Sequence, residues 1–392
     1  MIATPVYLDC NATSPLDPEV REMFFRFLTE EHGNEGSSTH VFGTQSKQAV
    51  RKAREQIAAV VSAKHDDVIF TSGATESNNL AILGLRSFGQ EQGKRHIITT
   101  QIEHKAVLEP CRALENDGFE ITYLPVARSG AVDLDAICAA LRSDTLLISV
   151  MHVNNETGIR QPLDEIAEVL NGHDAFFHTD AAQGFGKDLE PLHNPRIDLI
   201  SISGHKIYAP MGIGALITRR RKYNRPPTNP LLYPQITPLV YGGGQERGLR
   251  SGTLPVALIV ALGAAAEIAV RDHEKRLQAC KEFRRKALEA LAPLDVTLTG
   301  QQSLVMDHVL NISFPGLDAD VLLVALKDLI AISDGSACTS SRHGHAPRST
   351  SHVLKAMGMN DDEANACIRL SCCHLTPEVD WSAVVNRIRA LQ

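Results

Sequence analysis

A lysine follows a predicted buried strand in a context suited to an aldehyde cofactor. The tetrapeptide Ser-Gly-His-Lys at 203–206 comes directly after the apolar run 197–202. The amine of Lys206 could hold an aldehyde there as a Schiff base. Asp180, at the end of another apolar run, is the kind of group that pairs with a protonated pyridine nitrogen. A strand-end lysine and a strand-end aspartate together indicate a site for pyridoxal phosphate (PLP).

A phosphate anchor is predicted at residues 71–76, which follow the apolar run 68–70 and open a helix. Small residues, a glycine and hydroxyls at a helix start present free N–H groups to an anion. By itself the pattern favours a simple N-cap turn. Lys206 and Asp180 belong to the same predicted sheet, and PLP needs a phosphate site. Together they favour a phosphate anchor over a simple N-cap turn.

Three further polar side chains are candidates for contact with a cofactor. His104 follows a predicted strand that ends near Thr100, where an imidazole could stack on a pyridine ring and move protons near neutral pH. A single histidine is more often structural. Asn155 and Gln183 carry amides suited to a phenolic oxygen or a substrate, and each is weak evidence alone.

One thiol lies in a stretch that is too polar and flexible to pack in a core. Cys338 is surrounded by small residues at 333–341, and polar residues continue to Arg348. This predicts an exposed loop whose nucleophilic thiol could enter an active site, take a group and carry it out. A surface cysteine without a function is the alternative. The glycine-rich stretch 242–253 could be a phosphate contact or a subunit-contact loop.

Size and composition limit the class of protein. The chain has 392 residues, of which 43% are hydrophobic and 22% charged, as is ordinary for a globular protein with a large and a smaller domain. A net charge of −7 argues against directly bound nucleic acid. The N-terminus has no signal-peptide pattern and the apolar stretch 254–269 is too short to span a bilayer, so we expect a cytoplasmic protein without a membrane segment. The 8 cysteines show neither zinc nor secreted spacing, which predicts reduced thiols and no metal.

Strands and helices are expected to alternate from about residue 45 to 220. Apolar runs predict strands at 68–70, 96–100, 121–124, 146–153, 175–180 and 197–202. Helical spacing predicts helices at 44–63, 76–85, 106–115, 134–141 and 162–170. This order predicts an α/β fold with a mostly parallel central sheet covered on both faces, which binds ligands at the carboxyl ends of its strands.

A smaller α+β domain is expected after a long helical pattern at 254–291, which should link the two domains. Strands are predicted at 296–298, at 309–314 and near 330 and 368, with a helix at 319–326. The expected division is a large domain at 12–260 and a small one formed by 1–11 and 261–392, with the cysteine loop at about 333–350. The proline-rich segment 219–238 predicts an exposed loop of unknown role.

Together these motifs resemble those of the cysteine desulfurases of the NifS/IscS type, within the class V, fold-type I PLP enzymes. The resemblance is collinear from Tyr7 to about Trp381. Its specific motifs lie at 71–77, 103–105, 178–183, 203–206, 250–253 and 335–338.

The resemblance implies a role for each matching residue. Lys206 should hold PLP and move the substrate Cα proton, Asp180 should hold the pyridine N–H, and His104 should stack on the ring. The other implied contacts are Ala74, Thr75, Ser203 and His205 for phosphate, with Thr253 from the partner subunit of a homodimer; Gln183 for the phenolic oxygen; and Asn155, Arg369 and Asn34 for the substrate carboxylate.

The implied reaction turns L-cysteine into L-alanine, leaves a persulfide on Cys338 and passes that sulfur to an acceptor protein. The acceptor stays open among an iron–sulfur scaffold, a tRNA-thiolation pathway and a DNA-phosphorothioation system. Cys372 and Cys373 stand where the family usually has other residues, and either relay sulfur or pack in the interior.

Two other interpretations compete. Another class V enzyme, such as a selenocysteine lyase or a kynureninase-like hydrolase, is disfavoured by Cys338 on its predicted loop. A non-catalytic, partner-binding relative is disfavoured because Lys206, Asp180, His104 and Cys338 are all present.

Overall fold

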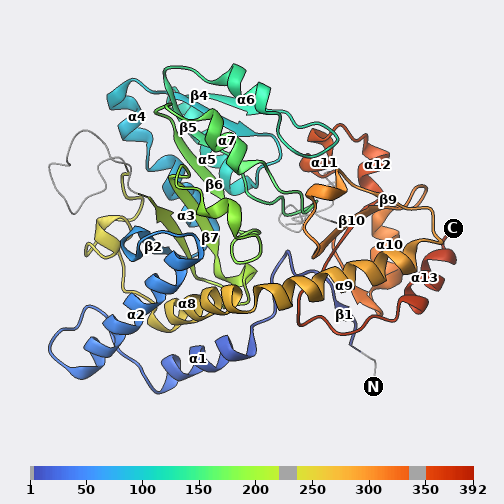
Figure 1. The fold of residues 1–392 in the computed structure, drawn as a ribbon, viewed down its shortest axis with the longest axis horizontal. Coiled ribbons are helices and arrows are strands. Elements are labelled where there is room, and N and C mark those ends of the chain that lie inside the picture. Colours follow the sequence, from blue (N-terminus) through green and yellow to red (C-terminus); the bar gives the residue numbers. More distant parts are fainter. Residues whose placement is uncertain (1–3, 220–235, 335–349) are drawn as a thin grey trace.

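A seven-stranded sheet forms the centre of the computed structural model, which describes residues 4–219, 236–334 and 350–392 (Figure 1). The strand order is β2-β8-β7-β6-β5-β3-β4, and only β8 is antiparallel to its neighbours. The strands are β2 (Val68–Thr71), β3 (His96–Thr100), β4 (Glu120–Leu124), β5 (Thr145–Ser149), β6 (Phe176–Asp180), β7 (Leu199–Ser203) and β8 (Gly214–Thr218). The predicted α/β fold with a mostly parallel sheet is therefore confirmed.

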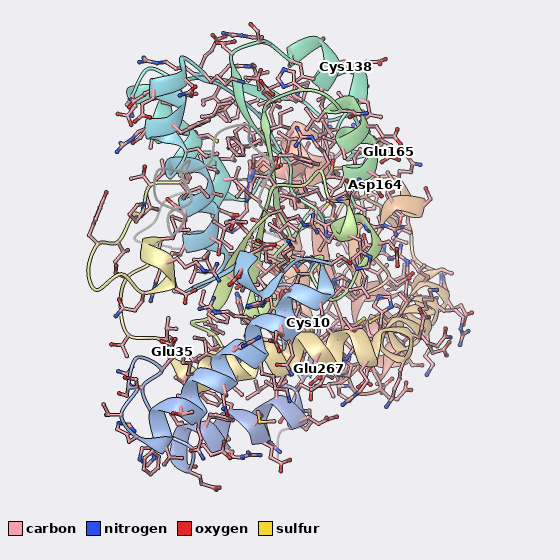
Figure 2. The ribbon with its side chains drawn as sticks, turned by 60° about the vertical axis from the view of Figure 1, so that its left-hand side comes forward. Cys10, Glu35, Cys138, Asp164, Glu165 and Glu267 are labelled. Carbon is pink, nitrogen blue, oxygen red and sulfur yellow. The ribbon has the colours of Figure 1, made fainter. Side chains whose placement is uncertain are left out.

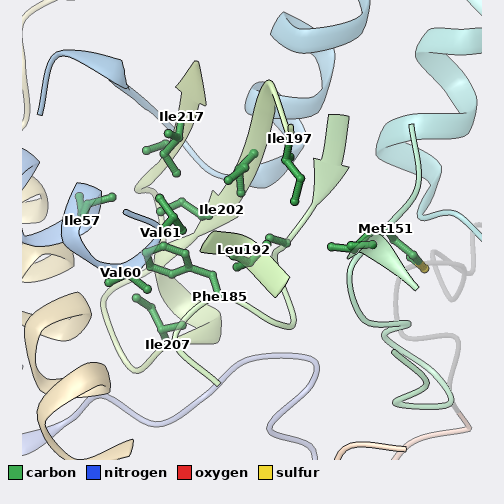
Figure 3. Close-up of a cluster of buried hydrophobic side chains, with 14 of the residues drawn as sticks. Ile57, Val60, Val61, Met151, Phe185, Leu192, Ile197, Ile202, Ile207 and Ile217 are labelled. Atoms are coloured by element: carbon green, nitrogen blue, oxygen red, sulfur yellow. The ribbon is translucent and has the colours of Figure 1, made fainter. Parts of the chain in front are cut away.

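Helices cover both faces of this sheet, because successive strand residues point to opposite sides. Ile97, Leu147 and Leu216 pack in one apolar cluster with α3 and α5, whereas their sequence neighbours pack on the other face with α2, α7 and α8. Figure 3 shows part of the second cluster, with Ile57 of α2 near Ile217 of β8. The helices that precede β8 in the sequence are α1 (Pro18–Thr29), α2 (Val41–Val60), η1 (His65–Asp67), α3 (Ala74–Leu83), α4 (Arg86–Gln92), α5 (Lys105–Asn116), α6 (Leu134–Ala140), α7 (Leu163–Val169), η2 (Glu190–His193) and η3 (Gly204–Lys206).

A second, smaller sheet has its own apolar core. Antiparallel strands β12, β10 and β9 pack with α9, α10 and α13, while the short strand β1 pairs in parallel with β11. The two cores agree with the expected large and small parts, and the domain boundaries stay a prediction. The elements are β1 (Val6–Tyr7), β9 (Thr297–Leu298), η5 (Gln302–Leu304), β10 (Val309–Ser313), α10 (Ala319–Leu326), β11 (Ile330–Ala331), α11 (His352–Ala356), α12 (Asp361–Asn365), β12 (Cys367–Ser371) and α13 (Trp381–Arg389).

The long helical pattern is two helices rather than one. The first helix, α8 (Val256–Arg271), follows the short helix η4 (Glu246–Gly248) in the sequence, and the second is α9 (His273–Leu291). Asp272 lies between them, and its φ of −103° and ψ of 13° interrupt the helical backbone. Helix α8 packs in the large core and α9 in the small one, so the pair spans both (Figure 1). In the described part of the chain, no helix is both long and apolar enough to cross a membrane.

Candidate active site

A cavity of about 370 Å³ lies at the carboxyl ends of the central strands, where a parallel sheet is expected to bind ligands. Residues predicted from the sequence line it together although they come from distant segments. They are Ala74, Thr75, His104, Asn155, Asp180, Gln183, Ser203, His205, Lys206 and Arg369. Asn34 and Thr253 do not line the cavity of this single chain, and Cys338 lies outside the described residues.

Lys206 closes the short helix η3 directly after β7, which points its side chain into the cavity. Its Nζ donates hydrogen bonds to the carbonyl oxygens of Asn11, at 2.5 Å, and Ala12, at 2.6 Å. The Gln183 side-chain amide donates to the same Asn11 carbonyl at 2.9 Å. The N-terminal segment therefore orients the amine.

Asp180 ends β6 and is only 6% exposed. Its Oδ2 accepts a hydrogen bond of 2.7 Å from the Asn78 side chain, and its Oδ1 accepts one of 2.9 Å from the Ala182 N–H. These two donors fix the carboxylate in one orientation at the cavity wall.

The start of α3 provides an anion site opposite these groups. Its N-cap residue, Gly73, has no side chain to cap the helix, and Ala74 and Thr75 line the cavity, so the first helical N–H groups can donate to a ligand. Ser203 and His205 stand beside them. Burial, together with Lys206, lowers the pKa of His205 to about 4, so this imidazole is neutral at pH 7.

His104 caps α5, with its Nδ1 accepting a hydrogen bond of 3.1 Å from the Ala106 N–H. In the neutral ring the proton therefore sits on Nε2. Its neighbour Glu103 is fully buried, and burial raises the pKa of Glu103 to about 8.

Arg369 enters the cavity from the second sheet, on β12. It is 2% exposed and donates to the Asn155 carbonyl at 2.7 Å and to the Asp9 carboxylate at 2.5 Å. A guanidinium held in this way can bind a substrate carboxylate.

The arrangement fits PLP on structural grounds. An amine, a carboxylate and an uncapped helix start share one cavity, and the buried Gln183 Oε1 has no hydrogen-bond partner among the residues that the structure describes. This unused polar capacity indicates that the cavity binds a polar ligand.

The sequence did not reveal several residues at this site. Asn11 and Ala12 hold the lysine, Asn78 holds Asp180, and Met211 lines the cavity. The polar stretch after β1 and the position of Asn78 one helical turn after Ala74 were the available signals.

The chain belongs to the aminotransferase class-V family, whose model matches residues 6–381. Over 383 residues it is 45% identical to the mitochondrial cysteine desulfurase of Drosophila melanogaster, covering 97% of this chain and 79% of that protein. The sequence-based resemblance to the cysteine desulfurases is therefore confirmed.

Solved structures of similar proteins show the same family relationship. A NifS-like protein aligns with a TM-score of 0.87 and 33% identity over 99% of both chains. A structure described as SspA in complex with cysteine aligns with a TM-score of 0.80 and 35% identity, covering 95% of this chain and all of the other. Members of the family use PLP, which agrees with the cofactor predicted from Lys206 and Asp180.

Proposed function

We propose that this chain is a PLP-dependent cysteine desulfurase that converts L-cysteine into L-alanine and transfers the sulfur to an acceptor. The cavity that joins Lys206, Asp180 and Arg369 carries this proposal. The names of its relatives support it, because a cysteine desulfurase is 45% identical and a structural neighbour was solved with cysteine.

The residues at the cavity have complementary tasks. Bound PLP supplies an electron sink for charge that develops at the substrate Cα. Lys206 would move the proton at this carbon, Asp180 would keep a proton on the pyridine nitrogen, and Arg369 would bind the substrate carboxylate. The α3 N–H groups would hold the phosphate, while His104 would contact the ring and exchange a proton.

Cys338 is proposed as the sulfur-accepting nucleophile. Its thiolate attacks the substrate sulfur, the carbon–sulfur bond breaks, and the sulfur stays on Cys338 as a persulfide while the three-carbon product leaves as alanine. The acceptor then takes that sulfur.

Two variants test the function. Lys206→Ala should abolish both alanine and sulfide formation, and borohydride should no longer fix PLP to the chain. Cys338→Ala should keep the yellow colour of bound PLP and lose sulfide release from cysteine. Full activity of Cys338→Ala, or borohydride labelling at a residue other than Lys206, rejects the mechanism.

A homodimer is also proposed. Phe25, Phe42, Met211 and Tyr241 are exposed apolar side chains, and the Met211 side chain, 70% exposed, also lines the cavity. Thr253 does not reach the cavity of its own chain, which agrees with a phosphate contact made to the partner subunit. Light scattering should give twice the chain mass of 42.7 kDa, and an active monomer contradicts the proposal.

The sulfur acceptor is proposed to be another protein in the same cytoplasmic compartment, and its pathway is left open among the three named above. Trapping the Cys338 persulfide with its partner in a pull-down identifies it. Comparing turnover of cysteine and selenocysteine separates a desulfurase from a selenocysteine lyase.

A further inference from the structure

A cluster of thiols that the proposed chemistry does not use joins the N-terminal segment, helix α9 and the segment after β12. Four cysteines from separate segments contribute to it, and all are at most 9% exposed: Cys10 after β1, Cys280 on α9, and Cys372 and Cys373 after β12. Lys187 lies among them, since the charges of all four thiols act on its pKa, which burial lowers. Among the described residues, no group of three or more His, Cys, Asp or Glu side chains is arranged to hold a metal ion.

Cys10 and Cys373 form a close pair within this cluster. They pack with Tyr208 in an apolar cluster of their own, and each thiol acts on the pKa of the other. Their backbones are also held together, because the Cys10 N–H donates to the Ser371 carbonyl at 3.0 Å. The two sulfur atoms are therefore neighbours through sequence-distant segments.

The two thiols of the pair are not equivalent. The Cys373 Sγ also accepts a hydrogen bond of 3.7 Å from the Thr376 hydroxyl. The Cys10 side chain lowers the pKa of Cys373, whereas the Cys373 side chain and burial raise the pKa of Cys10, so Cys373 is the first of the two to lose its proton. Lys187 lowers the pKa of both thiols and so does not distinguish them. Thiolates are the nucleophilic form of cysteine, which makes Cys373 the reactive member.

A small cavity lies on the Tyr208 side of the pair, although neither Cys10 nor Cys373 lines it. It has a volume of about 40 Å³ and is lined by Lys187, Tyr208 and Cys280. Tyr208 is the residue that packs on the pair, so the cavity lies beside it. A volume of this size exceeds the roughly 10–15 Å³ that one water molecule needs, and hydrogen peroxide is only slightly larger.

We propose that Cys10 and Cys373 form a reversible disulfide on reaction with a peroxide. The Cys373 thiolate attacks one peroxide oxygen, the O–O bond breaks, and a sulfenic acid forms while the departing hydroxide takes a proton to become water. The Cys10 thiol then loses its proton and attacks the sulfenic sulfur, forming the S–S bond and releasing a second water. The two sulfur atoms together lose two electrons, which the peroxide gains.

The position of this disulfide links it to the active site. Cys10 directly precedes Asn11 and Ala12, whose carbonyls accept from Lys206. Cys373 follows β12, which carries Arg369. The disulfide would join the segment that orients the Lys206 amine to the strand that carries the Arg369 guanidinium. Oxidation of the pair would therefore act on two segments that form the active site.

Disulfide mapping tests the proposal. The PLP-loaded, full-length protein, as wild type and as Cys338→Ser to remove a competing thiol, is treated with one equivalent of hydrogen peroxide. Free thiols are then blocked in denaturant and peptides identified by mass spectrometry. We expect a Cys10–Cys373 linked peptide that dithiothreitol removes. Its absence, or a link between Cys280 and Cys372 instead, overturns the proposal.

Control variants use cysteines outside the cluster. Cys111→Ser, at a buried position on α5, and Cys138→Ser, at an exposed position on α6, should leave the linked peptide unchanged. Figure 2 shows Cys138 at the upper edge of the molecule, away from Cys10. Loss of the link in either variant would contradict a specific pair.

The order of the two steps is tested with a sulfenic acid trap. In Cys10→Ser, which has no resolving thiol, dimedone should label Cys373 after peroxide, whereas in Cys373→Ser it should leave Cys10 unlabelled. Labelling of Cys10 alone would overturn the assigned roles. The wild-type disulfide map needs no substitution, so it tests the Cys10–Cys373 disulfide even where a variant folds poorly. It also does not depend on desulfurase activity.

Discussion

At the scale of single residues, we expect Asn78 to support cofactor binding through Asp180. It donates a buried hydrogen bond of 2.7 Å to the Asp180 carboxylate. A hydrogen bond to a charged group contributes about 1.5–3 kcal/mol, so we expect Asn78→Ala to weaken PLP binding roughly tenfold. Absorbance titration of the apoenzyme with PLP measures this. Asn79→Ala is the matched control, because Asn79 bonds only the Thr75 carbonyl of its own helix, and equal losses in both variants would contradict the role of Asn78.

Glu103 predicts a pH dependence of stability. Burial raises the pKa of Glu103 to about 8, against about 4.3 for a glutamate in an unfolded chain. Between these values the folded state holds a proton that the unfolded state releases. The free energy of unfolding therefore falls as pH rises, by up to about 1.4 kcal/mol per pH unit.

The variant Glu103→Gln should remove this slope, because an amide does not ionise and still accepts from Thr100 and the Met151 N–H. Urea unfolding from pH 5 to 9 should show the variant gaining on the wild type as pH rises. Parallel curves would show that Glu103 does not titrate in this range. Glu109→Gln, at an exposed position on α5, is the control.

The site residues that could be predicted from the sequence are those whose chemistry is carried by a local motif. Lys206 and Asp180 each end an apolar run, and the hydroxyl-rich segment before Glu76 opens a helix. Asn11 could not be found in this way, because it meets Lys206 across 195 positions of sequence and acts through its backbone carbonyl. Backbone acceptors carry no residue signature, so only the fold reveals them.

At the scale of elements, strand β8 positions the phosphate end of the cavity. It runs between β2 and β7, so Gly214 lies beside both Thr71 and Ser203. A Cβ at Gly214 would contact the Ile202 carbonyl oxygen and come within 2.6 Å of the Gly73 Cα. Only a glycine allows the loop before α3 to lie this close.

Gly214→Ala should therefore displace the start of α3. Overpacking of this kind costs about 1–3 kcal/mol, so we expect a lower melting temperature together with weaker PLP binding. Calorimetry and PLP titration measure the two effects. Gly36→Ala is the control, because its nearest contact is the flexible Asn34 side chain at 3.3 Å. Unchanged PLP affinity in Gly214→Ala would show that the loop does not depend on β8.

The elements that were predicted correctly have strong periodicity. Fully buried strands such as β3 and β6 are short runs rich in β-branched and aromatic residues, and α5 has a clear apolar face. The expected strand at 146–153 ends earlier, at Ser149, because the chain leaves the sheet to build the cavity wall with Met151 and Val153. The break at Asp272 was missed since residues on both sides favour helix and the change lies in one backbone conformation.

At the scale of the whole molecule, the small core contributes to a cavity built mainly on the large sheet. Arg369 reaches it from β12, and its ion pair with Asp9 joins β12 to the N-terminal segment. Helices α8 and α9 pack in different cores and link them. The two cores could be predicted from the sequence pattern. The proposed contribution of a subunit partner could not, because Thr253 lies outside the cavity of its own chain.

Subunit complementation tests whether the site is shared between two chains. Lys206→Ala lacks the amine, and Thr253→Glu places a negative charge where the proposed phosphate contact is made, so each homodimer should be inactive. A mixed dimer holds one site with both changes and one with neither, if Thr253 serves the partner's cavity. Random reassociation after mild unfolding makes half of the dimers mixed, so roughly a quarter of the wild-type activity should return. If Thr253 instead serves its own chain, every site keeps one lesion and mixing restores no activity.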